Sequence, residues 1–238
     1  MRAESGDTGA SCPPPREAAA PTVQRQVYDR LRRALMSGRF APGEGISLRK
    51  LAASFQTSTT PVREALRRLE NEGGLVAGPN RMLAVPEPDL ATVRELYDIR
   101  LAVEGMAAAR AAARITAAEL ATVEAACDAM AAAVEVAAIE RYLEENWRFH
   151  AAIYAAGRAP LLQGVIEGLW LRAGPLIRLV PGPAHFAQSM RSHRAALAAL
   201  RAGDAQAAGA AIERDLADAA ADLTRLLAQR QQQSDGEA

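Results

Sequence analysis

Two side chains able to ligate a metal ion lie one helical turn apart in the second half of the chain. Asn146 and His150 are four residues apart in the stretch ENWRFHAAIY, whose helical pattern places both side chains on one face. This is chelating spacing for a divalent metal, although polar residues in such a pattern also occur simply as part of a packed core. His185 follows Pro183 without a partner at useful spacing, and we expect it at the surface.

A second pair of residues could bind an acidic ligand. Arg100 precedes Glu104 by four residues, which allows a surface ion pair worth roughly 0.2 to 0.5 kcal/mol. The other interpretation is an inward arginine that holds a ligand carboxylate through a bidentate hydrogen bond. Arg172 and Arg178, farther along the chain, could help to neutralise the same acidic ligand, or they could be solvated.

Hydroxyl and guanidinium groups gather in the stretch STTPVREALRRLENEG. Pro61 suits the first turn of a helix, and one apolar face follows it, made of Val62, Ala65, Leu66 and Leu69. When that face packs inward, the opposite side carries Ser58, Thr59, Thr60, Arg63 and Arg67. Hydroxyl groups suit phosphate oxygens, whereas an arginine fork can bond O6 and N7 of guanine, so Arg63 is the best candidate for reading a base.

Neighbouring segments complete a module around this helix. Residues 22–38 and 47–55 have apolar side chains at helical spacing, and only a short turn separates the second segment from the helix at Ser58. The sequence LVAGPNRMLAV then predicts a β-hairpin, because turn residues stand between two short apolar pieces. Three helices and a hairpin are the layout of a winged helix-turn-helix, which we place at residues 22–88.

The charge of this module suits a polyanion. Residues 23–86 carry 11 basic and 5 acidic side chains, a net charge of +6, whereas 15 basic and 19 acidic residues follow from Asp89 onward. Arg49, in the second helix, is expected to clamp a phosphate or to reach a base from the edge of the major groove. Asn80 and Arg81, at the hairpin tip, are expected to enter the adjacent minor groove.

The composition favours packed helices. Of the 238 residues, 50% are hydrophobic and 4% aromatic, and alanine is abundant, which excludes all-β, fibrous and disordered classes. Residues 89–230 show six helical segments with short breaks, which predicts an antiparallel bundle, while residues 1–21 and 231–238 are expected to be flexible tails. Two cysteines are too few for a disulfide framework, and neither a membrane-spanning apolar run nor a signal-peptide core is visible, so we expect a cytoplasmic protein.

The sequence SLRKLAASFQTSTTPVREALRRLENEGGLV, followed by PNR, resembles the DNA-binding domain of GntR regulators. Its TPVREALRRLE stretch resembles the FadR-type branch, which has an all-helical effector domain. The resemblance implies a homodimer that binds an inverted repeat of double-stranded DNA through two copies of the helix at Ser58. The chain departs from the family pattern at Gln56 and Met82, where glycine is usual, and at Thr59, where arginine is usual.

The stretch LYDIRLAVEGMAAARAA resembles the opening helix of the family's FCD effector domain, with Arg100 and Glu104 at the pattern's Arg and Glu positions. The resemblance implies a divalent metal, zinc, nickel or manganese, held by four side chains that here are Asn146, His150, His193 and Asp215. Histidine is usual at the position of Asp215. The carboxylate makes the donor set richer in oxygen and shifts its preference towards harder ions.

These features predict a DNA-binding transcriptional regulator, a repressor by the family's commoner mode. A small carboxylate or sugar acid, bound by Arg100, Arg172 and the metal, would change the angle between the paired DNA-binding domains. One alternative keeps the DNA-binding module but makes the bundle a dimerisation block without a ligand. The other is a metal-dependent enzyme built on His150, His193 and Asp215, against which stands the lack of a nucleophile-base arrangement or a HExxH motif.

Overall fold

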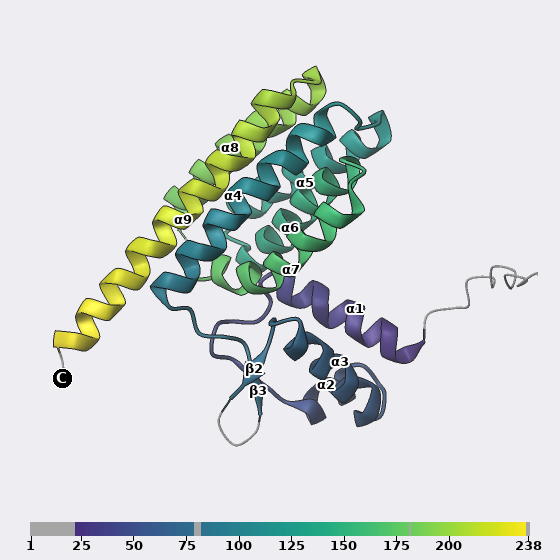
Figure 1. The fold of residues 1–238 in the computed structure, drawn as a ribbon, viewed down its shortest axis with the longest axis vertical. Helices are drawn as coiled ribbons and strands as arrows, with labels where there is room; N and C mark the ends of the chain where they lie inside the picture. The colour runs from purple at the N-terminus through teal and green to yellow at the C-terminus, as the bar shows by residue number, and fades with distance from the viewer. Residues whose placement is uncertain (1–21, 79–81, 181, 237–238) are drawn as a thin grey trace, which may run out of the picture.

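Three helices and a small sheet form the N-terminal part of the described chain, and six helices form the rest (Figure 1). The computed structural model describes residues 22–78, 82–180 and 182–236. The predicted fold class, a winged helix-turn-helix followed by an all-α bundle, is confirmed.

The N-terminal helices begin where the sequence provides capping groups. The side chain of Thr22 accepts a hydrogen bond from the backbone of Arg25 at 3.3 Å, and that of Ser47 accepts one from Lys50 at 3.4 Å. The third helix ends before Gly73, whose φ of +74° favours glycine. The helices are α1 (Val23–Met36), α2 (Leu48–Ser54) and α3 (Thr59–Asn71).

The wing belongs to a three-stranded antiparallel sheet with the order β1-β3-β2. The hairpin strands are β2 (Val76–Ala77) and β3 (Leu83–Ala84), and β1 (Gly45–Ile46) pairs with the other edge of β3. The sequence did not predict β1, because a two-residue strand is too short to show an alternating pattern. This added strand joins the wing to the segment that leads into α2.

The bundle consists of long helices separated at the predicted breaks: α4 (Leu90–Ala112), α5 (Ala117–Glu135), α6 (Ile139–Ala156), α7 (Pro160–Ile177), α8 (Pro183–Ala202) and α9 (Ala205–Gly236). Helix α9 continues to Gly236 and extends past the other bundle helices (Figure 1). Residues 231–236 are therefore helical, and the flexible C-terminal tail that we expected from residue 231 is wrong for them. No helix within the described ranges combines the length and the apolar character needed to cross a membrane.

Small side chains allow close packing of the bundle helices. Helix α4 packs along α9, and a Cβ atom on Gly209 of α9 would lie 3.1 Å from the carbonyl oxygen of Gly105 of α4. Helix α8 also packs on α9, and α5 packs on α6. Several polar side chains nevertheless lie inside this alanine-rich bundle, and a buried polar side chain requires a partner. These buried side chains are Arg100, Glu104, Asn146, His150, Ser189, Ser192, His193 and Asp215.

Candidate functional site

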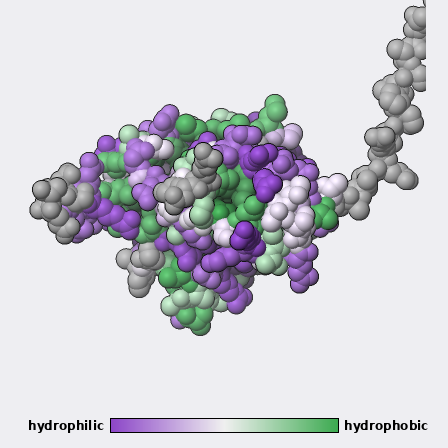
Figure 2. Space-filling view, turned by 90° about the horizontal axis from the view of Figure 1, so that it is seen from below, coloured by the Kyte–Doolittle hydropathy of each residue, from purple (hydrophilic) through white to green (hydrophobic). Residues whose placement is uncertain are grey.

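The N-terminal domain presents three of the predicted DNA-contacting arginines in one groove. Helix α3 buries Val62, Ala65, Leu66 and Leu69, which leaves Arg63 and Arg67 exposed on its other side. Together with Arg49 of α2 they line a groove of about 650 Å³ between α2, α3 and the wing. Arg63 forms no hydrogen bond or ion pair with the rest of the described chain, and Arg67 lies 3.4 Å from Glu64. Seen from this end, hydrophilic side chains surround smaller hydrophobic patches (Figure 2).

The start of α3 has free hydroxyl groups. Ser58 occupies the N-cap position, but its side chain makes no capping hydrogen bond and is exposed. Thr60 is also exposed, whereas Thr59 is half-buried. The hydroxyl of Ser58 therefore remains available to a phosphate oxygen near the helix N-terminus, where backbone amides favour an anion. Asn80 and Arg81 lie outside the described residues.

Two departures from the family pattern have visible consequences. Gln56, in the turn between α2 and α3, has a φ of +51°, which is the left-handed region that disfavours a residue with a Cβ atom. This explains why glycine is usual there. Met82 is 46% exposed and lines the same groove as Arg63, so it places an apolar side chain beside the DNA-facing arginines.

Three predicted metal ligands converge inside the bundle. His150 of α6, His193 of α8 and Asp215 of α9 are all buried, and their ligand atoms lie within 4.8 Å of one another. Oδ2 of Asp215 lies 3.3 Å from Nε2 of His150 and 3.3 Å from Nε2 of His193. Asn146 is buried one turn before His150 and lines the same cavity.

A hydrogen-bond chain fixes the orientation of His150. The hydroxyl of Tyr154 donates its proton to Oε2 of Glu104 in a short hydrogen bond, so it can only accept from His150. Nδ1 of His150, 2.9 Å from that hydroxyl, must therefore carry the proton. Burial lowers the pKa of His150 and favours the neutral ring. Its Nε2 lone pair then faces Asp215, which is unfavourable unless a cation lies between them.

The carboxylate of Asp215 is also held from its other side. Ser189 donates to Oδ1 at 2.8 Å and accepts in turn from the hydroxyl of Tyr142 at 3.0 Å. This leaves Oδ2 directed at the two histidines. The donor set, two imidazole nitrogens, one carboxylate oxygen and the nearby amide of Asn146, suits a divalent cation with harder character than copper.

Arg100 is fully buried, so the surface ion pair that we considered is wrong. Its Nε lies 2.6 Å from Oε1 of Glu104, and both side chains are shielded from solvent. Burial alone would lower the pKa of Arg100, but the Glu104 carboxylate raises it overall. Glu104 also accepts hydrogen bonds from Tyr154 and from the indole of Trp170, the latter at 3.1 Å. Its charge is therefore well compensated.

Three buried polar atoms in this region have no hydrogen-bond partner among the described residues: Nη1 of Arg100, the hydroxyl of Tyr97 and Nδ1 of His193. Arg100 and Tyr97 line the cavity that contains His150 and Asp215. An unpaired buried donor costs about 1 to 3 kcal/mol, which an anion in the cavity would recover. The cavity itself holds only about 20 Å³, enough for one water molecule or one ion.

His185 lies elsewhere than we expected, and the two arginines for which we left two positions open, Arg172 and Arg178, are not among the residues that line the cavity. His185 is not at the surface: its side chain is 10% exposed, Nδ1 lies 2.9 Å from Asp222, and the residue lines the cavity. The structure does not bring Arg172 into the cavity. Arg172 is exposed and donates to the carbonyl oxygen of Gly168 at 3.2 Å. Arg178 lies at the junction of the two domains, 3.4 Å from Glu140.

Sequence reasoning missed several residues of the site. His185, Ser189 and His193 recur at intervals of four on α8, a pattern that was visible and indicates one polar face. Tyr97 stands three residues before Arg100, which also indicates a shared face. Tyr154 follows His150 by four residues on α6, which is the same signal. Trp170 carried none, because its contact with Glu104 joins different helices.

Models of two protein families match the chain. The model described as "Bacterial regulatory proteins, gntR family" matches residues 23–85, and the FCD domain matches residues 95–218. The first match covers the groove with Arg49, Arg63 and Arg67. The second covers the ligand cluster of His150, His193 and Asp215.

Individual relatives agree with both matches. The HTH-type transcriptional regulator McbR of Escherichia coli K12 is 33% identical over 182 residues, 75% of this chain and 82% of the relative. The HTH-type transcriptional repressor RspR of the same strain is 31% identical over 147 residues, 62% and 64% of the two chains. A solved structure of E. coli McbR/YncC has a TM-score of 0.76 at 30% identity, over 88% of this chain and 98% of that one.

These relatives are transcriptional regulators, which rejects the enzyme alternative. The relatives and the two matched domains agree with the exposed arginines of one domain and the buried polar cavity of the other. The chain therefore belongs to the gntR family of bacterial regulatory proteins, as a DNA-binding transcriptional regulator with an FCD domain.

Proposed function

We propose that the chain is a cytoplasmic repressor that binds an inverted-repeat operator as a homodimer and responds to a small carboxylate or sugar acid. One relative, RspR, is named a transcriptional repressor, which supports this mode. The observation that carries the effector proposal is a cluster of three ligand atoms beside a buried cavity. The cavity is also lined by Arg100, whose Nη1 has no partner among the described residues. The domain boundaries that fit this division are residues 22–88 for DNA binding and residues from 89 onward for the effector.

His150, His193 and Asp215, with Asn146 beside them, would hold the metal. Because two neutral imidazole nitrogens and one carboxylate leave coordination positions open, manganese, nickel and zinc all suit the set. When bound, the metal supplies positive charge and open positions for a chelating oxygen ligand. Tyr154 orients His150, and Ser189 orients Asp215, so the protein part of the site is preorganised.

The effector carboxylate would bind next to this cluster. Nη1 of Arg100 and the hydroxyl of Tyr97 are the free donors for it, and Arg100 is already fixed by Glu104. Because the cavity holds only about 20 Å³, entry of an effector requires the helices around it to separate. That requirement links ligand binding to a change in the packing of the bundle.

Operator binding would use the groove of α3. Arg63 has no competing partner among the described residues and can reach a base edge, while Arg49, Arg67 and the hydroxyl of Ser58 can bond phosphates. Asn80 and Arg81 of the wing tip would add minor-groove contacts. A homodimer would present two such surfaces to an inverted repeat.

Thermal unfolding of the full-length protein tests the effector site. The midpoint should rise with Mn²⁺, Ni²⁺ or Zn²⁺, rise further with one member of a panel of small carboxylates and sugar acids, and fall back with a chelator. The double variant His150→Ala, His193→Ala should lose both increases and retain DNA binding. An unchanged ligand response in that variant would reject the metal.

The small volume of the cavity favours a second candidate, in which the bundle only dimerises the chain. The buried polar cluster would then be structural. This candidate predicts that no metal and no member of the panel changes the unfolding midpoint, while sequence-specific DNA binding persists.

A further inference from the structure

The two domains meet at a contact between backbones. Gly174 of α7 lies against the end of α1, where a Cβ atom on it would collide with the carbonyl oxygens of Leu35 and Met36. Gly38, just after α1, is also close: a Cβ on it would lie 2.9 Å from the carbonyl oxygen of Gly174. Since no flexible side chain separates these segments, a displacement of α7 must displace the end of α1.

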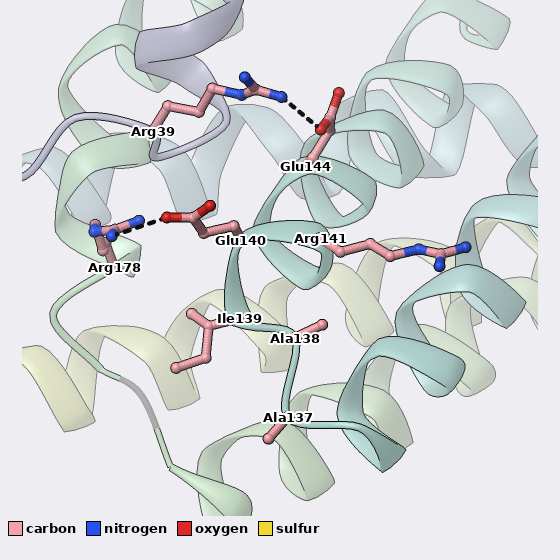
Figure 3. Close-up of a pocket in the computed structure, with 8 residues that line it drawn as sticks. All are labelled: Arg39, Ala137, Ala138, Ile139, Glu140, Arg141, Glu144 and Arg178. Carbon is pink, nitrogen blue, oxygen red and sulfur yellow. Dashed lines mark hydrogen bonds and ion pairs between the residues drawn. The ribbon is translucent and has the colours of Figure 1, made fainter.

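Ion pairs surround this glycine contact. Arg32 of α1 lies 2.7 Å from Glu167 of α7, and Nη1 of Arg178 donates to the carbonyl oxygen of Gly38 at 3.4 Å. At the groove shown in Figure 3, Arg39 of the N-terminal domain pairs with Glu144 of α6 across the junction at 3.0 Å, and Arg178 pairs with Glu140 at 3.4 Å within the bundle. The contact is therefore held on more than one side.

Helix α7 also reaches the end of the DNA-reading helix. The side chain of Leu171 lies against Gly74, and the guanidinium of Arg172 lies against Gly73, in the turn that ends α3. The structure therefore places Arg172 against the turn that ends α3 and not in the cavity. The same helix thus contacts both α1 and the end of α3.

Trp170, the residue before Leu171 on α7, lines the cavity. Trp170 is 1% exposed, its indole donates to Glu104, and its ring lies 4.7 Å from the guanidinium carbon of Arg100 and 5.3 Å from the His150 ring. Trp170 and Tyr154 share one oxygen of Glu104, Oε2. Any ligand that moves Arg100 or His150 must therefore alter the surroundings of Trp170.

We propose that α7 couples the cavity to the DNA-binding domain, with Trp170 as the positioning residue and Gly174 as the contact that moves α1. The proposal rests on the proposed function, because it takes the cavity as the site of metal and effector binding. A ligand anion that competes with Glu104 for Arg100, or a metal that draws on His150, changes the hydrogen bond to Trp170. The turn of α7 from Trp170 to Gly174, which precedes the buried Pro175, then shifts and carries Leu35 to Gly38 with it.

Amide hydrogen exchange of the full-length protein, with Zn²⁺ alone as the ligand, tests this coupling. Metal binding, measured separately by calorimetry, should change exchange at residues 35–39 by at least about fivefold. The variant Trp170→Phe keeps an aromatic ring but loses the donor to Glu104. Its affinity for Zn²⁺ should stay within about threefold of that of the parent chain. Metal binding should, however, no longer change exchange at residues 35–39.

Leu161→Ala provides the matched control, because Leu161 lies on the same helix and is 88% exposed. It should bind Zn²⁺ and show the original response at residues 35–39. Metal binding that leaves those residues unchanged in the parent chain, or changes them equally in Trp170→Phe, overturns the proposal.

A second arm needs no ligand. Tyr154→Phe removes one donor to Oε2 of Glu104, which leaves Trp170 and Arg100 as its donors. It should change exchange at residues 35–39 through Trp170, but not in the double variant with Trp170→Phe. If Zn²⁺ fails to bind, the metal part of the proposed function is rejected, and this arm alone decides the coupling. No change at residues 35–39 in Tyr154→Phe would then reject it.

Discussion

The guanidinium of Arg100 lies 2.6 Å from the carboxylate of Glu104 on the next turn of α4, and neither side chain reaches solvent. This geometry explains how a charged side chain stays inside an alanine-rich bundle, because Glu104 compensates Arg100 and is itself bonded by Tyr154 and Trp170. A buried pair of this kind does not add net stability over apolar residues, but each partner depends strongly on the other.

Replacing Glu104 alone should therefore destabilise the protein strongly. Glu104→Leu leaves Arg100 buried without a counter-charge and should lower the free energy of unfolding by about 3 to 5 kcal/mol, measured by urea denaturation. Arg148→Ala is the control, because Arg148 forms a comparable pair with Glu145 but its side chain is 66% exposed. It should cost less than about 1 kcal/mol. Similar losses in both variants would contradict the burial argument.

Restoring the family's usual residue at Asp215 should alter metal preference. Asp215→His replaces a carboxylate oxygen by an imidazole nitrogen, which should favour zinc over manganese by about tenfold relative to the parent chain. Competition calorimetry with the two ions measures this ratio. Asp222→His, in the His185 pair farther along α9, should leave the ratio unchanged. An unchanged ratio in Asp215→His would remove Asp215 from the ligand set.

Arg63 should read a base, in contrast to Arg49. Selection of preferred duplexes from a random pool supplies the operator. Arg63→Ala should then weaken operator binding by roughly 1 to 3 kcal/mol and relax the preference at one base position. Arg49→Ala should weaken binding to all duplexes alike and reduce the slope of log affinity against log salt by about 1. A preference unchanged in Arg63→Ala would assign base reading to another residue.

The backbone at Gln56 should be strained. Its φ of +51° lies in the left-handed region, so Gln56→Gly should raise the free energy of unfolding by about 1 kcal/mol. Ala53→Gly places the same residue in the last turn of α2, where the backbone is helical and glycine should lower that free energy by up to roughly 1 kcal/mol. A rise in the free energy of unfolding for Gln56→Gly and a fall for Ala53→Gly, both from denaturant titrations, would confirm the strain. A fall in both variants would reject it.

The sequence predicted the helices well because their ends are local. Thr22, Ser47 and Gly73 each provide a terminating or capping group within a few residues of the helix that they affect. The strand β1 had no comparable signal, since two residues gain a partner only when the wing folds back onto them. The helical end of α9 at residues 231–236 was missed because a polar composition was taken to mean a tail.

The candidate site was predictable in part. The i,i+4 spacing placed Asn146 and His150 on one face, and the resemblance to the FCD domain implied His193 and Asp215, which the structure brings together with His150. Arg172 is different, because its location depends on how α7 is rotated against the neighbouring domain. His185 depends on Asp222, which is 37 residues away in the chain. A contact between two helices joins residues that are far apart in the sequence, so no single segment predicts it.

The domain contact at Gly174 should not tolerate a methyl group. Gly174→Ala must push apart α7 and the carbonyl oxygens of Leu35 and Met36, and overpacking of this kind costs about 1 to 3 kcal/mol. Calorimetric unfolding should show a lower midpoint, with the DNA-binding domain separating from the bundle at lower temperature.

Gly164→Ala on the same helix is the matched control. A Cβ atom there meets no atom within 4 Å, so the substitution should instead stabilise the helix by roughly 0.5 to 1 kcal/mol. Equal effects of the two alanines would mean that the backbone contact does not hold the domains together. Opposite effects would assign that role to the contact of Gly174 with α1, because the two variants differ only in what the new methyl group meets.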